Sequence, residues 1–272
     1  MPPQPSHAEA YEYYFSSGYY DARYPRPNVH VLNVAQAALP AQGGHVIDFG
    51  CGSGRYTLPF LARAETVASF DICTSARARL VENLDALEPP RRPVVLGPER
   101  DSLERHVLQQ GPADVVLALF GVIAHVEGAE NRRELLAWLA SLVSPQRGRV
   151  ILSVPNRARR FKPEQRARHD TEGIRYVRNH GQQALRFFYK LYDVADLRAD
   201  LEAAGLEIER LYAESLLPES WLANAAPLGQ IDRWISRRLP ARYGYGLLAV
   251  ARPTARVDAL CAPRLETRAT CG

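Results

Sequence analysis

Residues 46–54 read VIDFGCGSG: an apolar run reaches an acid, Asp48, and three glycines then follow at alternate positions. Glycine loses more conformational freedom on folding than any other residue, so three glycines within five residues need a structural reason. A glycine-rich turn between a strand and the next helix lets a ligand approach the backbone beside the helix N-terminus. The stretch therefore predicts the first strand of an α/β fold, with a ligand-binding turn directly after it.

The spacing of the glycines distinguishes this turn from a dinucleotide-binding turn. A dinucleotide site has the pattern GxGxxG, whereas Gly50, Gly52 and Gly54 follow the pattern GxGxG and Arg55 takes the place of the third glycine. The carboxylate of Asp48, two residues before the first glycine, would repel a pyrophosphate and attract an ammonium group. The turn therefore suits a ligand with a zwitterionic tail.

A second acid follows the next predicted strand. That strand ends in SFDIC, which places Asp71 at its carboxyl end, 17 residues beyond Gly54. Ligands of open parallel sheets bind outside the carboxyl ends of the strands. A carboxylate at this position can accept hydrogen bonds from both hydroxyls of a ribose and would repel a 2′-phosphate.

From residue 45 onward, runs rich in β-branched residues and bounded by Gly or Pro alternate with helix-like runs. We expect strands at 45–50, 66–72, 92–97, 113–121, 148–155, 207–215 and 245–252. We expect helices at 28–39, 54–64, 74–87, 101–110, 131–143, 194–205 and 228–239. This alternation predicts a parallel, doubly wound sheet.

At this point the sequence resembles the class I S-adenosylmethionine-dependent methyltransferases, over roughly residues 45–252. The motifs that carry the resemblance are DFGCGSG, SFDI, ADVVLALFGVIAHV and GRVILSVPN. The resemblance implies an α/β fold with a seven-stranded, mostly parallel, doubly wound sheet in the order 3-2-1-4-5-7-6, strand 7 being antiparallel. It also implies S-adenosyl-L-methionine as cofactor and S-adenosyl-L-homocysteine as product.

The same resemblance suggests a division of the chain. Residues 1–44 would form an N-terminal aromatic lid and helix, and residues 45–252 the methyltransferase domain. Insertions at about 156–190 and 216–243 would build the roof over the substrate, and residues 253–272, which show no period, would form a flexible tail.

The resemblance also assigns the cofactor contacts. Asp48, Gly50, Gly52 and Gly54 would line the methionine end, and we include Cys51 of the same turn, although a thiol after a buried strand is ordinarily a small apolar side chain. Asp71 would hold the ribose, Ile72 would pack on the adenine, and Phe120 would form the near wall. Arg23, in YYDAR, would pair with the methionine carboxylate.

The stretch LGPERDSLE departs from the family pattern, which places an acid just after a glycine beside the adenine amine. Glu99, Asp101 or Ser102 could take that part, and we favour Asp101 followed by Ser102.

Methyl transfer from a sulfonium is an in-line displacement, so the protein must align the acceptor, exclude water and, where needed, take a proton. His125, in LFGVIAHV, lies just past the fourth strand and would serve as a general base or acceptor contact, or else brace the turn. Tyr14 and Tyr20, of the stretch 11–28 with its seven aromatic residues, would cover the methyl group, or else join the N-terminal helix to the core.

Two later stretches are candidates for substrate contacts. RFFYKLY (186–192) offers Phe187, Phe188, Tyr189 and Tyr192 as the wall of an apolar acceptor pocket, or as a core strand. The arginine-rich residues 156–169 would either bind phosphates or form a solvated loop.

Composition limits the class of protein less than the motifs do. The net charge of +4 permits anionic partners without requiring them, and no run is long and apolar enough to span a membrane. The four cysteines lack zinc-ligand spacing, so we expect no metal. We therefore expect a cytoplasmic bacterial enzyme that methylates oxygen or nitrogen of a small-molecule acceptor, with its oligomeric state open. A tRNA wobble-uridine-type RNA methyltransferase and a non-catalytic S-adenosylmethionine-binding protein are the alternatives.

Overall fold

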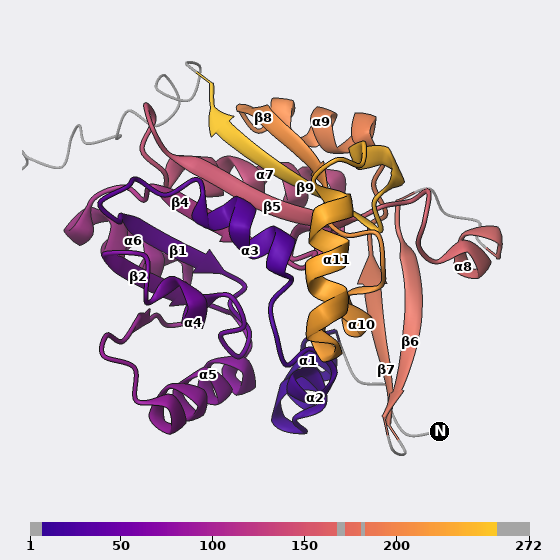
Figure 1. Ribbon diagram of the computed structural model, residues 1–272, viewed down its shortest axis with the longest axis horizontal. Helices are drawn as coiled ribbons and strands as arrows, with labels where there is room; N and C mark the ends of the chain where they lie inside the picture. Colours follow the sequence, from indigo (N-terminus) through magenta and orange to yellow (C-terminus); the bar gives the residue numbers. More distant parts are fainter. Residues whose placement is uncertain (1–6, 168–171, 181–182, 255–272) are drawn as a thin grey trace, which may run out of the picture.

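The seven-stranded sheet at the centre of the fold has the order β3-β2-β1-β4-β5-β9-β8 (Figure 1). The computed structural model describes residues 7–167, 172–180 and 183–254. The strands of the sheet are β1 (His45–Phe49), β2 (Thr66–Phe70), β3 (Val94–Val95), β4 (Val115–Ala118), β5 (Arg149–Pro155), β8 (Leu206–Ala213) and β9 (Gly246–Pro253). β9 is antiparallel to both β5 and β8, whereas the other neighbours are parallel. The predicted strand order is therefore confirmed, with β8 and β9 as the sixth and seventh strands.

Helices cover both faces of this sheet. One face carries α3 (Val29–Gln36), α4 (Thr57–Phe60) and α5 (Thr74–Leu87), and the other α6 (Arg100–Gln110), α7 (Ala129–Ser141) and α9 (Val194–Ala203). Successive residues of a strand point to opposite faces, so Val46 packs in one layer and Ile47 in the other. All five residues of β1 are buried, as expected for a strand covered on both sides.

Three predicted elements are much shorter than the sequence suggested, one of them the strand expected at 113–121, which is reduced to β4. The helix expected at 54–64 shrinks to the four residues of α4, because Gly54 still has the positive φ of the turn (93°) and cannot begin a helix. The strand expected at 92–97 is reduced to β3, a two-residue edge strand that begins directly after Pro93, which has no N–H to donate to a ladder.

The remaining elements gather at the carboxyl end of the sheet. They are α1 (His7–Ser16), α2 (Tyr19–Arg23), the hairpin of β6 (Ile174–His180) and β7 (Gln183–Tyr189), α8 (Lys162–Arg166), α10 (Glu219–Asn224) and α11 (Ala226–Ser236). The hairpin is a separate two-stranded sheet that lies beside α1 (Figure 1). Rings from α1 and α2 form an apolar cluster with Leu185 and Phe187 of β7. The N-terminal segment and the hairpin thus make one aromatic layer.

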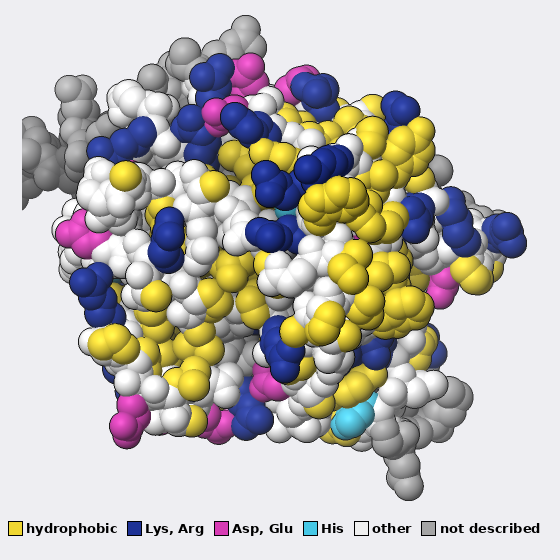
Figure 2. All heavy atoms as spheres, in the orientation of Figure 1, with side chains coloured by type: hydrophobic (Ala, Val, Ile, Leu, Met, Phe, Trp, Pro, Cys, Tyr) yellow, Lys and Arg dark blue, Asp and Glu magenta, His cyan; other side chains and the backbone are white. Residues whose placement is uncertain are grey.

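Figure 2 shows the face formed by α3 and α11, on which arginines gather beside apolar side chains. Ile231 and Trp234 of α11 are 57% and 61% exposed. A hollow of about 760 Å³ on this face is lined by Arg147, Arg149, Arg210, Arg233 and Arg237, among others. In the part of the chain that the structure describes, no helix is long and apolar enough to cross a membrane.

The carboxyl-terminal boundary differs slightly from the prediction. β9 continues through Pro253, and the N–H of Thr254 still donates to the carbonyl of Gly205 (2.8 Å). Residues 255–272, the rest of the predicted tail, lie outside the described residues.

Candidate active site

The turn after β1 brings the backbone to the edge of a cavity. Gly50 and Gly52 have φ values of 75° and 56°, in the left-handed region that favours glycine. A Cβ atom at Gly50 would lie 2.5 Å from Val122, and one at Gly52 would lie 3.1 Å from Phe15. Side chains at these positions would fill the space over the turn, so the two glycines keep it open for a ligand.

Asp71 fastens this turn to the end of β2. Its Oδ2 accepts the N–H of Gly52 and its Oδ1 accepts the N–H of Cys73, both at 2.9 Å. The carboxylate is 9% exposed, and burial raises its pKa. A carboxylate has about four lone-pair sites, so two backbone bonds leave capacity for two further donors such as vicinal hydroxyls. Its position at the cavity wall therefore fits the predicted ribose contact.

The cavity itself has a volume of about 590 Å³ and lies at the carboxyl ends of β1, β2 and β4. The turn and the end of β2 form one side, α1 and α2 another, and the hairpin a third. Aromatic rings make up a large share of its lining. Its size is in the usual range of small-molecule sites.

The segment after β4 forms a strained turn that places the ring of Phe120 in the cavity. Phe120 has a φ of 62°, which is unfavourable for a residue with a Cβ, and Gly121 follows with 79°. Ser153 of β5 supports the turn, because its Oγ accepts the N–H of Phe120 (2.8 Å) and its carbonyl accepts that of Gly121 (3.0 Å). The ring of Phe120 lines the cavity, as predicted for the near wall.

His125 lines the cavity with a defined tautomer. Its Nδ1 lies 2.9 Å from the backbone carbonyl of Phe188. A carbonyl oxygen can only accept, so Nδ1 carries the proton, and in the neutral ring Nε2 holds the basic lone pair. The ring stacks on Tyr189 at 4.4 Å and meets Tyr11 edge-on at 5.3 Å. The residue is thus oriented as a general base would be.

Tyr14 and Tyr20 also line the cavity, and both are buried (6% and 8% exposed). Their rings meet edge-on at 5.7 Å. Burial raises the pKa of each hydroxyl well above its ordinary value, so both phenols are neutral at physiological pH. They can form an apolar cover or donate a hydrogen bond, but neither can serve there as a phenolate base.

Strand alternation divides the predicted substrate wall. Phe187 and Tyr189 face the cavity, together with Tyr176 of the paired strand β6. Phe188 and Tyr192 are buried but do not line it. Two of the four predicted wall residues thus line the cavity, and their role as substrate contacts stays a prediction.

Three residues of the predicted cofactor set lie beneath the turn and do not line the cavity. Asp48 is buried and accepts a hydrogen bond from the hydroxyl of Thr57 (2.7 Å), and burial raises its pKa to about 6. Cys51 is a buried thiol of the core. A Cβ at Gly54 would lie 2.4 Å from Leu80 of α5, so this glycine permits close helix packing. These residues shape the turn from below.

Of the residues predicted to lie near the adenine, one lines the cavity and two do not. Ile72 lines the mouth of the cavity and is 73% exposed. Asp101 is exposed on α6 and does not line the cavity, and Ser102 turns its hydroxyl to the carbonyl of Gly97 (2.8 Å). Pro98, Arg100 and Trp138 line this end instead, with the guanidinium of Arg100 4.9 Å from the centroid of the Trp138 ring.

The predicted partner of the methionine carboxylate is directed elsewhere. Nε of Arg23 donates to the hydroxyl of Tyr24 (3.1 Å), and Arg23 does not line the cavity. Tyr24 does line it, so the YYDAR segment contributes through its neighbouring ring.

Several arginines of the stretch 156–169 form ion pairs or hydrogen bonds within the protein. Arg157 pairs with Asp193 (3.1 Å) and Asp196. Arg159 donates to the carbonyl of Tyr243 (2.7 Å), and Arg160 lines the cavity. Residues 168 and 169 lie outside the described residues. Within the described part of this stretch, these three arginines are therefore held by contacts within the protein or face the cavity.

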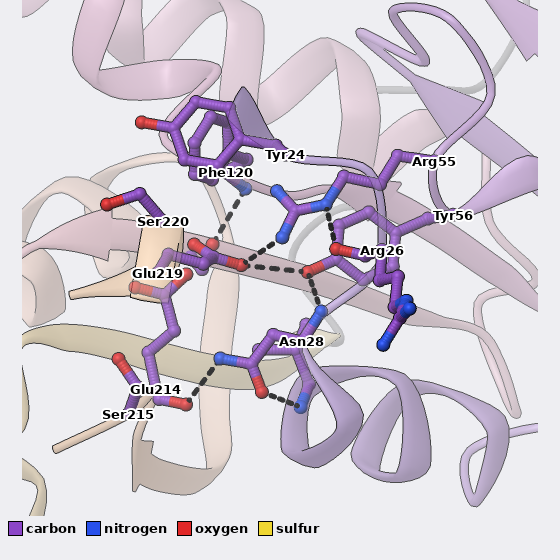
Figure 3. Close-up of polar contacts among 12 residues, drawn as sticks. Tyr24, Arg26, Asn28, Arg55, Tyr56, Phe120, Glu214, Ser215, Glu219 and Ser220 are labelled. Carbon is purple, nitrogen blue, oxygen red and sulfur yellow. Dashed lines mark hydrogen bonds and ion pairs between the residues drawn. The ribbon is translucent and has the colours of Figure 1, made fainter. Parts of the chain in front are cut away.

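A buried ion pair that the sequence did not reveal joins the turn to the carboxyl-terminal insertion (Figure 3). Arg55 donates to Glu219, the first residue of α10, at 2.8 Å, and their side chains are 3% and 8% exposed. Nε of Arg55 donates to the carbonyl of Arg26 (2.8 Å), and the hydroxyl of Tyr56 lies 3.3 Å from the same carboxylate. The arginine that replaces a third glycine thus holds α10 against the turn.

Glu214 lies beside this pair, buried after β8 (Figure 3). Burial, with the nearby charge of Glu219, raises the pKa of Glu214 to about 8. Near pH 7 this carboxyl group is therefore mostly protonated.

This shift gives a pH dependence with a definite sign. Between about pH 4.5 and 8 the folded chain keeps a proton on Glu214 that the unfolded chain has released, so this group makes stability fall as pH rises through that window. Relative to the wild type, the free energy of unfolding of Glu214→Gln is expected to rise by roughly 4 kcal/mol between pH 5 and pH 9. Urea denaturation at both pH values measures it, with the exposed Glu207→Gln as control. An equal difference at the two pH values would contradict the assignment.

Comparisons with known proteins agree with this architecture. The profile of the family described as "Methyltransferase domain" matches residues 20–211. A search of the curated proteins gave no match.

Three solved structures illustrate the similarity of fold. The CcbJ methyltransferase from Streptomyces caelestis is 16% identical with a TM-score of 0.63, over 92% of this chain and 100% of that one. Magnesium protoporphyrin IX methyltransferase from Synechocystis PCC 6803, with bound SAM, is 18% identical with a TM-score of 0.53, over 93% and 99%. The 1,6-didemethyltoxoflavin-N1-methyltransferase of Burkholderia thailandensis, with its acceptor and S-adenosylhomocysteine bound, is 20% identical with a TM-score of 0.52, over 93% of each chain.

Proposed function

The chain belongs to the class I S-adenosylmethionine-dependent methyltransferases, and from that premise we propose that it methylates an oxygen or nitrogen atom of a small-molecule acceptor. The observation that carries the proposal is that residues suited to the cofactor and residues suited to an acceptor line the same cavity. Gly50, Gly52 and Asp71 line one part, as the cofactor requires, and His125 with the hairpin rings lines another. A chamber of about 590 Å³ suits two small molecules better than a folded nucleic acid.

The residues present fit the cofactor. The glycines leave room that any Cβ would fill, and Asp71 keeps acceptor capacity for a ribose. S-adenosylmethionine, when bound, supplies a methyl group on a positively charged sulfur. The chain's own part is to orient the acceptor against it, and the aromatic layer over the cavity excludes water from the reacting atoms.

His125 would take the acceptor's proton. S-adenosylmethionine bound in the cavity would supply the methyl carbon to the acceptor atom and would keep the electron pair of its carbon–sulfur bond on sulfur. The acceptor's O–H or N–H proton then passes to Nε2 of His125, because Nδ1 already donates to the carbonyl of Phe188. The fixed tautomer is what makes this direction of proton transfer available.

We also propose that residues 1–44 act as the lid. Support comes from the packing of α1 and α2, whose rings share an apolar cluster with the hairpin and line the cavity. The insertions near 156–190 and 216–243 supply the hairpin, α10 and α11.

A labelling experiment tests the proposed acceptor class. Purified protein is incubated with radioactive S-adenosylmethionine and an extract of the encoding organism, which is then divided into small-molecule, RNA and protein fractions. We expect the label in the small-molecule fraction. Label in RNA would favour the tRNA alternative, and binding of S-adenosylhomocysteine without any transfer would favour the non-catalytic alternative.

A further inference from the structure

The charged side chains of the cavity are divided between its ends. Its two carboxylates, Glu12 and Asp71, lie near the end of β2, where backbone N–H groups bond to both. Arg100 lies at the adenine end, against Trp138. The two other arginines of the lining, Arg160 and Arg178, lie at the hairpin end. That end therefore carries positive charge that no carboxylate of the lining offsets.

Arg160 is held among rings rather than acids. The centre of its guanidinium lies 5.3 Å from the centroid of the Tyr189 ring and 4.9 Å from that of Tyr245. Among the described residues no carboxylate oxygen lies within 4.0 Å of it, and its buried Nε has no hydrogen-bond partner there. A desolvated cation without a partner is costly, so this position favours an anion.

Arg178 reaches the same chamber from β6. Its guanidinium lies 5.2 Å from the centroid of the Tyr176 ring, and within the described ranges it forms no ion pair. Three residues earlier, Arg175 points to the other face of the hairpin and pairs with Glu127. One arginine of the strand is thus paired at the surface and the other is left facing the cavity.

Elsewhere the chain pairs its buried arginines. Arg55 bonds to Glu219, and Arg132 lies 3.3 Å from Glu172. The carboxyl group whose charge would act most directly on Arg160 is Glu214, but burial raises its pKa to about 8, so near pH 7 it is mostly neutral. Arg160, which is partly buried, therefore differs from Arg55 and Arg132 in having no ionised carboxylate partner among the described residues.

We propose that the acceptor is a flat, largely aromatic acid, and that Arg160 and Arg178 bind its carboxylate. The inference rests on the proposed function and adds the class of acceptor. Rings such as Tyr176, Phe187 and Tyr189 offer stacking surfaces for a planar body, and guanidinium groups match a carboxylate in charge and geometry. The carboxylate is the anchor rather than the methylated group, because bonds to guanidinium groups reduce the nucleophilicity of its oxygens. The atom that accepts the methyl group would lie beside His125.

The same charges could instead bind the carboxylate of the cofactor's methionine, so the test separates the two. The probes are 4-hydroxybenzoate, 4-hydroxyphenylacetate and 3-hydroxy-2-naphthoate, each compared with its uncharged carboxamide. Affinities for protein saturated with S-adenosylhomocysteine are measured by calorimetry. The variants are Arg160→Met and Arg178→Met. Their matched controls are Arg159→Met, next in sequence, and Arg175→Met, on the outer face of the same strand.

We expect at least one acid to bind, and its amide to bind about tenfold more weakly or worse. Arg160→Met and Arg178→Met should each weaken binding of the acid by a similar factor. The control variants Arg159→Met and Arg175→Met should bind the acid as the wild type does. Affinity for S-adenosylhomocysteine should change by less than about twofold in Arg160→Met and Arg178→Met. The proposal is overturned if no acid binds, if acid and amide bind equally, or if the two variants lose affinity for S-adenosylhomocysteine instead. Failure of the wild type to bind S-adenosylhomocysteine at all would be a failure of the proposed function, which is a separate result.

Discussion

Replacing Arg55 by Met is expected to lower the free energy of unfolding by about 3–5 kcal/mol. The substitution removes the cation but leaves Glu219 buried, with 8% of its side chain exposed. An unpaired buried carboxylate costs far more than the loss of a surface ion pair, which contributes at most about 1 kcal/mol. The loss is measured by urea denaturation at pH 7.

The control is Arg79→Met. Arg79 also pairs with two acids, Asp21 and Glu82, but its side chain is 41% exposed. The double variant Arg55→Met with Glu219→Gln removes both charges and should recover much of the stability. If Arg55→Met cost no more than Arg79→Met, the buried pair would not be what holds α10 to the turn.

Replacing His125 by Asn is expected to reduce kcat by about 10²–10⁴-fold, the usual contribution of a positioned general base. The Asn side chain can still donate a hydrogen bond to the carbonyl of Phe188, but it has no equivalent of the basic Nε2. Affinity for S-adenosylhomocysteine should change by less than about twofold. The measurement uses the acceptor that the labelling experiment identifies.

The matched control is His180→Asn, at the end of β6 in the hairpin. His180 stacks on Tyr19 at 4.3 Å and does not line the cavity. A loss of cofactor affinity as large as the loss of kcat would make His125 a structural or cofactor-binding residue.

The features that the sequence predicted correctly are local. Strand β1 is readable because each of its residues is buried between two helical layers, and the glycine turn because it needs left-handed φ values within five residues. The position of Asp71 at the cavity wall follows from its place at the end of a strand, whereas its contact with a ribose stays a prediction. Each of these depends on neighbours close in the chain, and local patterns record such neighbours.

The hairpin illustrates what local patterns miss. Strand β6 reads IRYVRNH, which lacks a regular apolar face because Arg178 lies on the same side of the strand as Tyr176 and faces the cavity. A signal was nevertheless present in β7. A period of two would have placed Phe187 and Tyr189 on one face and Phe188 on the other.

Long-range pairing accounts for the rest. Arg55 and Glu219 are 164 residues apart, and nothing near either residue indicates the other. Likewise Trp138 reaches the adenine end from α7, whereas the sequence points to Asp101 and Ser102 only through their place after β3. The contribution of such residues is decided by the packing of whole elements, which spacing within one motif does not encode.

The central claim is that the cavity above the glycine turn binds S-adenosylmethionine with its ribose on Asp71. Calorimetric titration with S-adenosylhomocysteine tests it most directly, on the wild type, on Asp71→Ala and on Asp85→Ala, an exposed acid of α5. We predict one bound molecule per chain, a loss of roughly 1–3 kcal/mol in Asp71→Ala because the ribose hydroxyls lose a charged acceptor, and no change in Asp85→Ala. A wild type that does not bind, or an Asp71→Ala variant that binds as tightly as the wild type, would contradict the account.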